Sequence, residues 1–270
     1  MMQDYKAAKN TFIDEVRVED YIGLEGSRKA YERLEESIDK PLKMILVYGQ
    51  PGTGKTLMLN RIYHNHRHQK DIHFIDTPIG SRKEFYRKLF EIITGKMMPS
   101  NSKIEFETFV EYGKKMKGRR DIVILLDEAQ IYPGDMLEEI RILSDTGSMK
   151  FVLSAHETEG DELLSKKHFQ SRIWERIELK NADFDELKTY IYKRLLNRGL
   201  IDIANQFSDK QNRFIFKMTK GNFRECNKLL YSAFEIYEYY ETHKPEKVDY
   251  KRISMKILEM AAIKSGFIDV

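Results

Sequence analysis

The chain has 270 residues, of which 41% are hydrophobic and 33% charged, and its formal net charge is +3. This composition indicates a folded globular protein, and the small net charge argues neither for nor against a nucleic-acid partner. The single cysteine, Cys226, excludes an intrachain disulfide and fits a reducing compartment. We see no signal-peptide pattern and no apolar run long enough to cross a bilayer. We therefore expect a cytoplasmic protein without direct membrane insertion, which reaches the inner face of a membrane only through a partner.

Short apolar runs alternate with helical patterns over the first two thirds of the chain. The runs predicted as strands are 43–48, 72–76, 121–127, 150–154 and 176–179. The nearly continuous apolar character of the first, third and fourth runs is typical of strands buried on both faces of a parallel sheet. Helices are predicted over 104–117, over 135–144 and after Ser81, which forms a capping box with Glu84. The pattern predicts a layered α/β fold.

The chain changes character after Leu179. Further capping boxes are Asp183 with Glu186, Ser208 with Gln211, and Asn222 with Glu225. Gly199 and Gly221 are predicted helix stops, and a last helix is expected over about 250–265. We therefore expect an α/β core over residues 1–180 and an all-helical region over residues 181–270.

The stretch "GQPGTGKT", residues 49–56, fits the pattern G-x-x-x-x-G-K-[ST] between a predicted strand and a predicted helix. Its glycines let backbone N–H groups turn inward around an anion, and the helix start adds a positive dipole end. We expect the loop to bind ATP, with Lys55 at the β- and γ-phosphates and the Thr56 hydroxyl on Mg²⁺. The predicted nucleotide-binding residues of this segment are Gly49, Gln50, Pro51, Gly52, Thr53, Gly54, Lys55, Thr56 and Leu57.

A second motif, "IVILLDEAQ", ends a predicted strand with Asp127 and Glu128. These two carboxylates fall at the carboxyl end of the strand, where open α/β sheets bind their ligands. Asp127 is predicted to hold Mg²⁺, directly or through water. Glu128 is predicted to polarise the water that attacks the γ-phosphate, so we expect ATP hydrolysis rather than binding alone.

Three further stretches extend these motifs into a family pattern: "LEEIRILSD" (137–145), "FQSRIWERIEL" (169–179) and "KGNFRECNKLL" (220–230). With them the sequence resembles the AAA+ ATPases, and more specifically the ExeA, MshM and TniB group, from about residue 43 to 230. The resemblance implies a parallel five-stranded sheet of order 5-1-4-3-2. It also implies that residues 1–180 bind the nucleotide, with the N-terminal segment 1–40 near the base, and that 181–270 form a lid.

The resemblance assigns roles to individual residues outside the two phosphate motifs. Sensor 1, a polar residue at the end of the fourth strand, is either Ser154 or His156. Sensor 2, an arginine that opens a lid helix, is Arg224. Tyr21 and Ile22 are candidates to line the adenine pocket, although both would serve equally well in a core.

The resemblance also implies an arginine finger, which completes the site of a neighbouring subunit and stabilises charge in the transition state. It is expected just before the fifth strand. Arg172 holds that position, and Arg176 is the alternative. A finger that acts on a neighbour implies a homo-oligomer.

We therefore expect an ATPase that hydrolyses ATP at subunit interfaces to assemble or remodel a protein partner, as in ExeA- and MshM-like secretion, pilus or DNA-uptake machines. The alternative is an ATP-controlled DNA-binding adaptor of transposition or replication, as in TniB-like proteins. The basic run "GKKMKGRRD" (113–121) would suit DNA phosphates, but it precedes the third strand and so lies at the end away from the nucleotide. Nucleic acid is thus a partner that we do not favour.

Overall fold

The structure is a computed structural model that describes residues 4–99, 104–158, 167–247, 249 and 251–268. The chain divides into two compact units. The helical unit consists of Met1–Arg28, Pro51–Gly54 and Lys180–Val270, and the α/β unit consists of Lys29–Gln50 and Lys55–Leu179. No helix among the described residues is long and apolar enough to cross a membrane.

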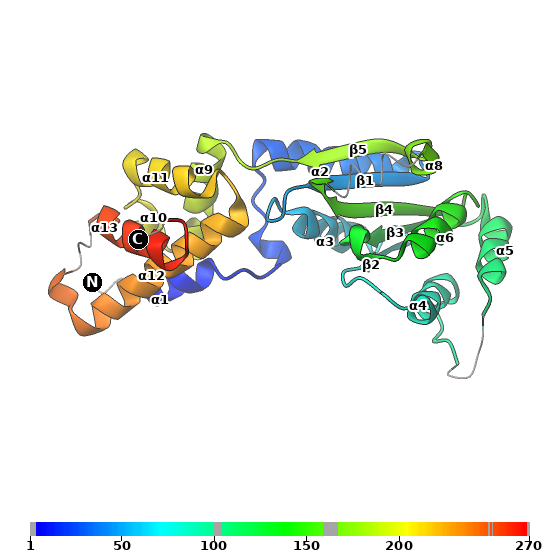
Figure 1. The fold of residues 1–270 in the computed structure, drawn as a ribbon, viewed down its shortest axis with the longest axis horizontal. Coiled ribbons are helices and arrows are strands. Elements are labelled where there is room, and N and C mark those ends of the chain that lie inside the picture. The colour runs from blue at the N-terminus through cyan, green and yellow to red at the C-terminus, as the bar shows by residue number, and fades with distance from the viewer. Residues whose placement is uncertain (1–3, 100–103, 159–166, 248, 250, 269–270) are drawn as a thin grey trace. The chain divides into compact units, whose positions relative to one another are not determined.

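The α/β unit is built on one parallel sheet, which has five strands in the described part of the chain (Figure 1). The strands are β1 (Met44–Gly49), β2 (Ile72–Ile75), β3 (Ile122–Leu126), β4 (Met149–His156) and β5 (Ile173–Leu179). Their order is β2-β3-β4-β1-β5. Read from the other edge this is 5-1-4-3-2, so the predicted fold class and strand order are confirmed.

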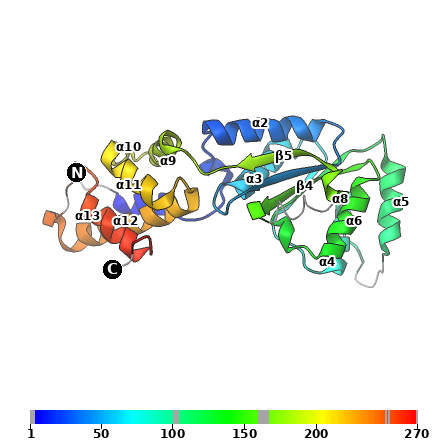
Figure 2. The ribbon, with the colours of Figure 1, turned by 45° about the horizontal axis from the view of Figure 1, so that its top comes forward.

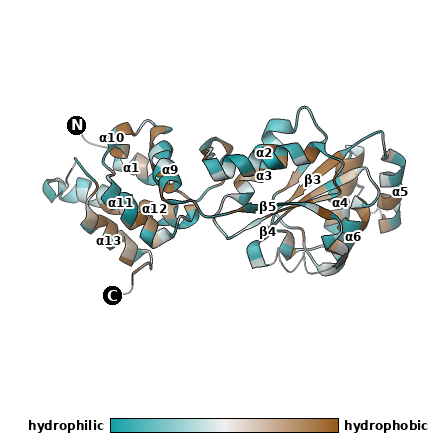
Figure 3. Cartoon of the chain, turned by 90° about the horizontal axis from the view of Figure 1, so that it is seen from above, coloured by the Kyte–Doolittle hydropathy of each residue, from teal (hydrophilic) through white to brown (hydrophobic). Residues whose placement is uncertain are grey.

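Helices cover both faces of this sheet (Figure 2). They are α2 (Glu25–Asp39), α3 (Lys55–His66), α4 (Arg82–Thr94), α5 (Phe106–Met116), α6 (Gly134–Ser144) and the short α8 (Lys167–Gln170). Ile45 and Val47 of β1 pack with α2 and α3, whereas Met44 and Leu46 pack with α4, α5 and α6. Neighbouring strand residues point to opposite faces, so a strand covered on both sides needs an unbroken apolar sequence. Figure 3 shows this hydrophobic character along β3.

The helical unit contains the predicted C-terminal helices and an N-terminal one. Its elements are α1 (Tyr5–Thr11), η1 (Val18–Asp20), α9 (Phe184–Leu196), α10 (Ile201–Ala204), α11 (Asp209–Thr219), α12 (Phe223–His243), η3 (Pro245–Lys247) and α13 (Met255–Lys264). The predicted capping boxes of α9 and α11 form in full. At α12, Asn222 accepts a hydrogen bond from the Glu225 amide. The capping box predicted at Ser81 is wrong, because the Ser81 side chain makes no capping hydrogen bond.

The N-terminal residues lie in a different unit from the one that the sequence indicates. We expected residues 1–40 with the α/β core, whereas the structure groups Met1–Arg28 with the helical unit. The reason is aromatic packing, since the Tyr5 ring lies 4.5 Å from that of Tyr237 on α12. An ion pair of 2.8 Å between Asp20 and the buried Arg194 of α9 adds to it. The division of the chain into a nucleotide-binding core and a lid stays a prediction.

Two strands are longer than their apolar runs. β4 continues to His156, and β5 begins at Ile173. His156 is therefore the last residue of a strand, and Arg176 lies within β5 rather than at its start. The predicted strand boundaries were too short because polar side chains near these strand ends interrupt the apolar pattern.

Candidate nucleotide site

The predicted phosphate loop joins β1 to α3. Gly49 is the last residue of the strand, and Lys55 is the first residue of the helix. Gly52 and Gly54 have φ angles of 82° and 95°, a region that side chains other than glycine rarely adopt. The Lys55 side chain is buried, and its Nζ donates to the carbonyl oxygens of Gly49 at 2.9 Å and Gln50 at 3.0 Å. The ammonium group is thus held against the first residues of the loop.

The middle of the loop packs within the helical unit, to which it belongs. Asn222 Nδ2 donates to the Pro51 carbonyl at 2.7 Å. A Cβ atom on Gly52 would lie 2.4 Å from Asn222 Oδ1 and 2.7 Å from Arg224 Cβ, so no side chain fits there. Arg224, the predicted sensor 2, therefore starts α12 beside the phosphate loop. Its Nε lies 3.1 Å from Asp14 Oδ2, and its side chain is half exposed.

The predicted acidic pair follows β3. Asp127 is buried, and its Oδ1 accepts a hydrogen bond of 3.0 Å from the Glu128 amide. Glu128 has φ 48° and ψ 48°, a left-handed conformation that is strained for a residue with a side chain and is common at functional sites. Its Oε2 lies 3.1 Å from His156 Nε2 and also accepts from Gln130 Nε2. Two neighbouring side chains thus fix the direction of the Glu128 carboxylate.

The two candidates for sensor 1 have different surroundings, and the assignment between them stays a prediction. Ser154 and His156 point to the same face of β4, two residues apart. His156 pairs in register with Gly49 at the start of the phosphate loop and reaches Glu128. Ser154 pairs with Val47, one step deeper, and its buried Oγ has no hydrogen-bond partner among the described residues. The sequence left both candidates open. It also gave no signal that Gln130 bonds Glu128, apart from the position of Gln130 in "DEAQ".

The residues predicted to hold Mg²⁺ carry suitable donors. Thr56 supplies a hydroxyl in the first turn of α3, and Asp127 supplies a carboxylate at the end of β3. Mg²⁺ prefers oxygen ligands and commonly takes one or two from the protein, with phosphates and water completing its shell. Among the described residues no group of three or more histidine, cysteine, aspartate or glutamate side chains is placed to bind a metal. The donor set therefore suits an ion that is bound together with phosphates.

The two residues predicted near adenine lie in the helical unit. Ile22 is buried in its hydrophobic core, and Tyr21 directly follows η1. Ile22 therefore serves in the core of the helical unit, the alternative to the adenine pocket that we considered for both residues. A contact of either with the base stays a prediction.

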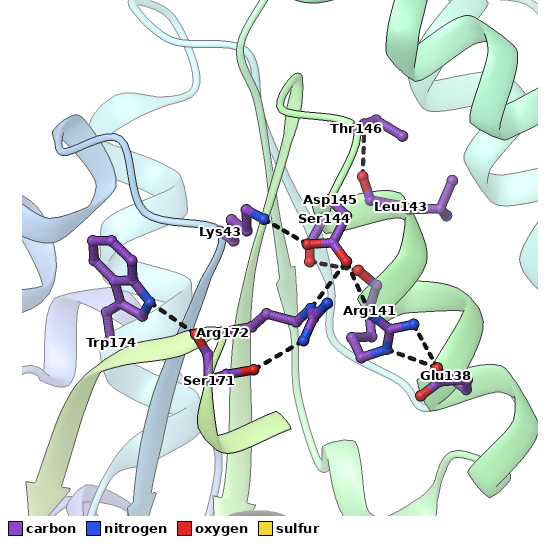
Figure 4. A network of polar contacts seen from close by, with 10 residues as sticks. All are labelled: Lys43, Glu138, Arg141, Leu143, Ser144, Asp145, Thr146, Ser171, Arg172 and Trp174. Carbon is purple, nitrogen blue, oxygen red and sulfur yellow. Dashed lines mark hydrogen bonds and ion pairs between the residues drawn. The ribbon is translucent and has the colours of Figure 1, made fainter. Parts of the chain in front are cut away.

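Arg172, the predicted finger, lies between α8 and β5 in a network of charged side chains (Figure 4). Its Nε lies 2.9 Å from Asp145 Oδ2, and Asp145 also pairs with Lys43 at 2.6 Å and Arg141 at 2.8 Å. Burial by itself raises the pKa of the Asp145 carboxyl. Hydrogen bonds from Lys43 and Arg172, with their charges, outweigh burial and hold this pKa below its usual range. Asp145 is a partner that sequence reasoning missed, because it lies 27 residues from Arg172.

Arg172 lies far from the phosphate loop of its own chain. The next residue, Ile173, pairs with Met44 at the start of β1, whereas the phosphate loop follows Gly49 at the other end of that strand. Five residues of parallel strand at about 3.3 Å each separate the two ends by roughly 17 Å. The alternative finger, Arg176, is exposed within β5, and its side chain makes no ion pair with the part of the chain that the structure describes.

A phosphate loop after the first strand, an acidic pair after the third and the strand order 2-3-4-1-5 are the arrangement typical of the AAA+ fold. Comparison with sequence families agrees with this arrangement. The model of the AAA domain family matches residues 39–164, which span the phosphate loop, the acidic pair and strands β1 to β4. No curated protein matches the sequence.

Three solved structures illustrate the similarity in fold. The ORC2 protein of Aeropyrum pernix, in ADPNP–ADP complexes, is 15% identical with a TM-score of 0.63, over 97% of this chain and 72% of its own. Cdc6p of Pyrobaculum aerophilum is 15% identical with a TM-score of 0.65, over 95% and 71%. The RuvB Holliday junction branch migration motor of Thermotoga maritima is 19% identical with a TM-score of 0.56, over 96% and 76%. At such low identity the similarity shows the fold alone.

Proposed function

We propose that this chain is an AAA+ ATPase that hydrolyses ATP with Mg²⁺. The observation that carries the proposal is the fixed Glu128 carboxylate, which follows the buried Asp127 at the carboxyl end of β3. A carboxylate beside a magnesium ligand can accept a proton from, and orient, the water that attacks the γ-phosphate. His156 and Gln130 hold Glu128 in position for this role.

The remaining residues bind and position the nucleotide. Lys55, which now donates to loop carbonyls, would donate to phosphate oxygens when ATP is bound. Thr56 and Asp127 would hold a Mg²⁺ ion, which would neutralise charge on the phosphates. Arg224 acts as sensor 2, because it opens α12 beside Gly52 of the loop. Its pairing with Asp14 on the half-exposed surface is one that a phosphate group can replace.

We propose that the site is completed in a homo-oligomer by Arg172 of the next subunit. About five residues of strand separate Arg172 from its own phosphate loop, so it serves another copy better than its own. An arginine placed beside the γ-phosphate by a neighbour stabilises the charge that develops in the transition state. Arg176 is the alternative, and its exposure leaves it available.

The test is the substitution Glu128→Gln, which keeps the shape of the side chain and removes its basicity. We expect ATP binding within about twofold of the parent and turnover reduced by at least a hundredfold. Glu36→Gln, on the exposed face of α2, is the matched control and should leave both unchanged. Turnover of Glu128→Gln close to that of the parent would remove Glu128 from the mechanism.

For the partner, we propose a protein complex that the ATPase assembles or remodels, as in the ExeA- and MshM-like proteins that the sequence resembles. The second candidate is a DNA-loading adaptor, and it is favoured by similarity in fold to domain III of the Thermotoga maritima replication initiation protein DnaA and to the Aeropyrum pernix ORC1 protein in complex with DNA. The basic run 113–121 gives the DNA-adaptor hypothesis less support, because its Arg120 is already bound to Asp71 and to the carbonyls of Ile92 and Ile93. A DNA affinity that rises with ATP and falls with salt would favour the adaptor, and no binding at modest salt would exclude it.

A further inference from the structure

The helical unit contains a groove of about 400 Å³ along one side of α9. The α9 residues that line it recur at the spacing of one helix face, and they include Asp185, Lys188, Thr189, Tyr192 and Leu196. Ala204 of α10, Phe207 and Asn212 of α11 form the opposite wall, and Figure 1 shows these helices beside one another. Eleven residues of helix at about 1.5 Å each give the groove a length of roughly 17 Å. None of its lining residues is one that we assign to the nucleotide.

Most of the surface inside the groove is apolar. Tyr192 and Leu196, one helical turn apart on α9, are 38% and 40% exposed. Ile191 and Ala204 are buried, and Phe207 packs partly buried against the same core. A hollow of this size, with mostly apolar walls and a few polar groups, is the usual form of a ligand site.

Asn212, in the wall of the groove, has a side-chain oxygen that is not satisfied by the fold. The residue is 3% exposed, and its Oδ1 is buried without a hydrogen-bond partner among the described residues. An unpaired buried acceptor destabilises a folded chain, so its presence in a groove requires a reason. Rotation about the last torsion exchanges the two ends of a carboxamide, which lets the oxygen turn to a donor that enters the groove. An N–H group of a ligand would therefore complete the site.

The unpaired acceptor and the length of the groove favour an extended peptide as the occupant. In an α-helix the backbone N–H groups are bonded within the helix, whereas an extended segment still has N–H groups to donate. Five extended residues at about 3.3 Å each span the length of the groove. Alternate side chains of such a segment point to the same side, so three of the five face the groove together.

Charge indicates which side chains the peptide carries. Lys188 is already paired with Asp209 at 2.6 Å. Asp185, in the first turn of α9, and Lys193, in its last turn, line the groove and make no ion pair among the described residues. They are eight residues apart, about 12 Å along the helix, and residues i and i+4 of an extended chain are about 13 Å apart. A basic and an acidic residue four positions apart, with an apolar residue between them, therefore match the groove.

We propose that the groove between α9 and α11 binds an extended peptide segment of a protein partner. The apolar residue of the peptide packs against Tyr192 and Phe207, and its basic and acidic residues pair with Asp185 and Lys193. A backbone N–H of the peptide donates to Asn212 Oδ1. The inference goes beyond the proposed ATPase, because the groove shares no residue with the nucleotide site and gives the chain a place to hold a protein.

Selection of peptides tests the charge pattern. We would select random seven-residue peptides displayed on phage against the full chain without nucleotide, and measure the enriched peptides by fluorescence anisotropy. We expect oppositely charged residues four apart around an apolar residue. Lys193→Glu should turn the selection to peptides that are basic at both positions, because both ends of the groove are then acidic. Lys217→Glu, on the exposed face of α11 and outside the groove, is the matched control and should select like the parent.

Two results of the selection would overturn the proposal. One is the absence of enriched peptides, and the other is selection of the same peptides by the parent and by Lys193→Glu. Lys55→Ala should bind the peptides like the parent, so the outcome does not depend on whether the ATPase proposal holds.

Substitution of Asn212 separates a role in binding from a role in the fold. Asn212→Leu keeps the size of the side chain and removes the unpaired acceptor, so the melting temperature should be unchanged or higher. Peptide affinity should nevertheless fall at least about tenfold, because the peptide N–H loses its acceptor. Unchanged affinity would mean that water alone satisfies Asn212, and would overturn the proposal.

The apolar wall provides a further measurement. Tyr192→Ser should weaken the selected peptides at least about tenfold, whereas Tyr239→Ser, which alters an exposed aromatic side chain of α12, should bind them like the parent. Sedimentation of the same proteins tests a second copy as the occupant. A dimer of the parent chain that Tyr192→Ser separates would contradict a groove kept open for a partner.

Discussion

At the scale of single residues, the site places two polar side chains of β4 in different surroundings. His156 contacts Glu128, whereas the buried Ser154 hydroxyl has no partner among the described residues. We expect His156→Ala to lower turnover at least about tenfold with ATP binding retained, because Glu128 loses a group that orients it. Ser154→Ala should leave turnover near that of the parent and raise stability by up to about 1 kcal/mol, since it removes an unpaired buried hydroxyl. Steady-state kinetics and thermal unfolding measure these two effects. A larger loss of turnover in Ser154→Ala than in His156→Ala would make Ser154 the sensor.

At the scale of elements, α6 connects the surroundings of Glu128 to Arg172. The helix begins at Gly134, shortly after the acidic pair, and ends at Ser144; the next residue, Asp145, caps it and bonds Arg172. We expect Asp145→Asn to reduce turnover by about tenfold while ATP binding persists, because Arg172 is no longer held in one direction. Combining it with Arg172→Ala should cause no further loss, since Asp145 acts through that arginine. Glu138→Gln, which alters the carboxylate that bonds Arg141, is the control.

The Asp145 carboxylate also makes the stability of the folded chain depend on pH. The pKa of Asp145 is lowered in the folded chain from an ordinary value of 3.8. The stability that it contributes is therefore complete above that ordinary value and is lost as the pH falls through the lowered pKa. Asp145→Asn should flatten the acid side of the stability curve, measured by denaturant unfolding between neutral and acid pH. An unchanged curve would show that Asp145 has no net stabilising role.

At the scale of the whole molecule, the proposed finger makes each site the product of two copies. Lys55→Ala loses productive ATP binding, and Arg172→Ala loses the finger, so each protein alone should have little turnover. Mixed at equal amounts, roughly a quarter of the junctions join an intact phosphate site to an intact finger. We therefore expect recovery to about a quarter of the parental rate, with a maximum near equal mixing. Co-assembly without any recovery would contradict a finger that acts between subunits.

The sequence by itself determined the elements whose signals are local. The phosphate loop lies between β1 and α3 because glycines, lysine and threonine at fixed spacing suit one strand–loop–helix geometry. The acidic pair follows β3 because an apolar run ends there. The alternation of strands and helices indicated the parallel sheet, and capping residues marked α9 and α11. Each of these features depends on residues within a few positions of one another.

Only the tertiary structure decided which distant residues meet. It placed Asp145 on Arg172, His156 on Glu128 and the N-terminal helix against α12. It also formed the groove of the helical unit, which depends on the packing of α9 against α10 and α11 and leaves no pattern in any one of them. The physical reason is the same in each case. Such contacts are fixed by the packing of the sheet and the helical unit as wholes, where residues far apart in the chain compete for the same partners, and no local propensity encodes that choice.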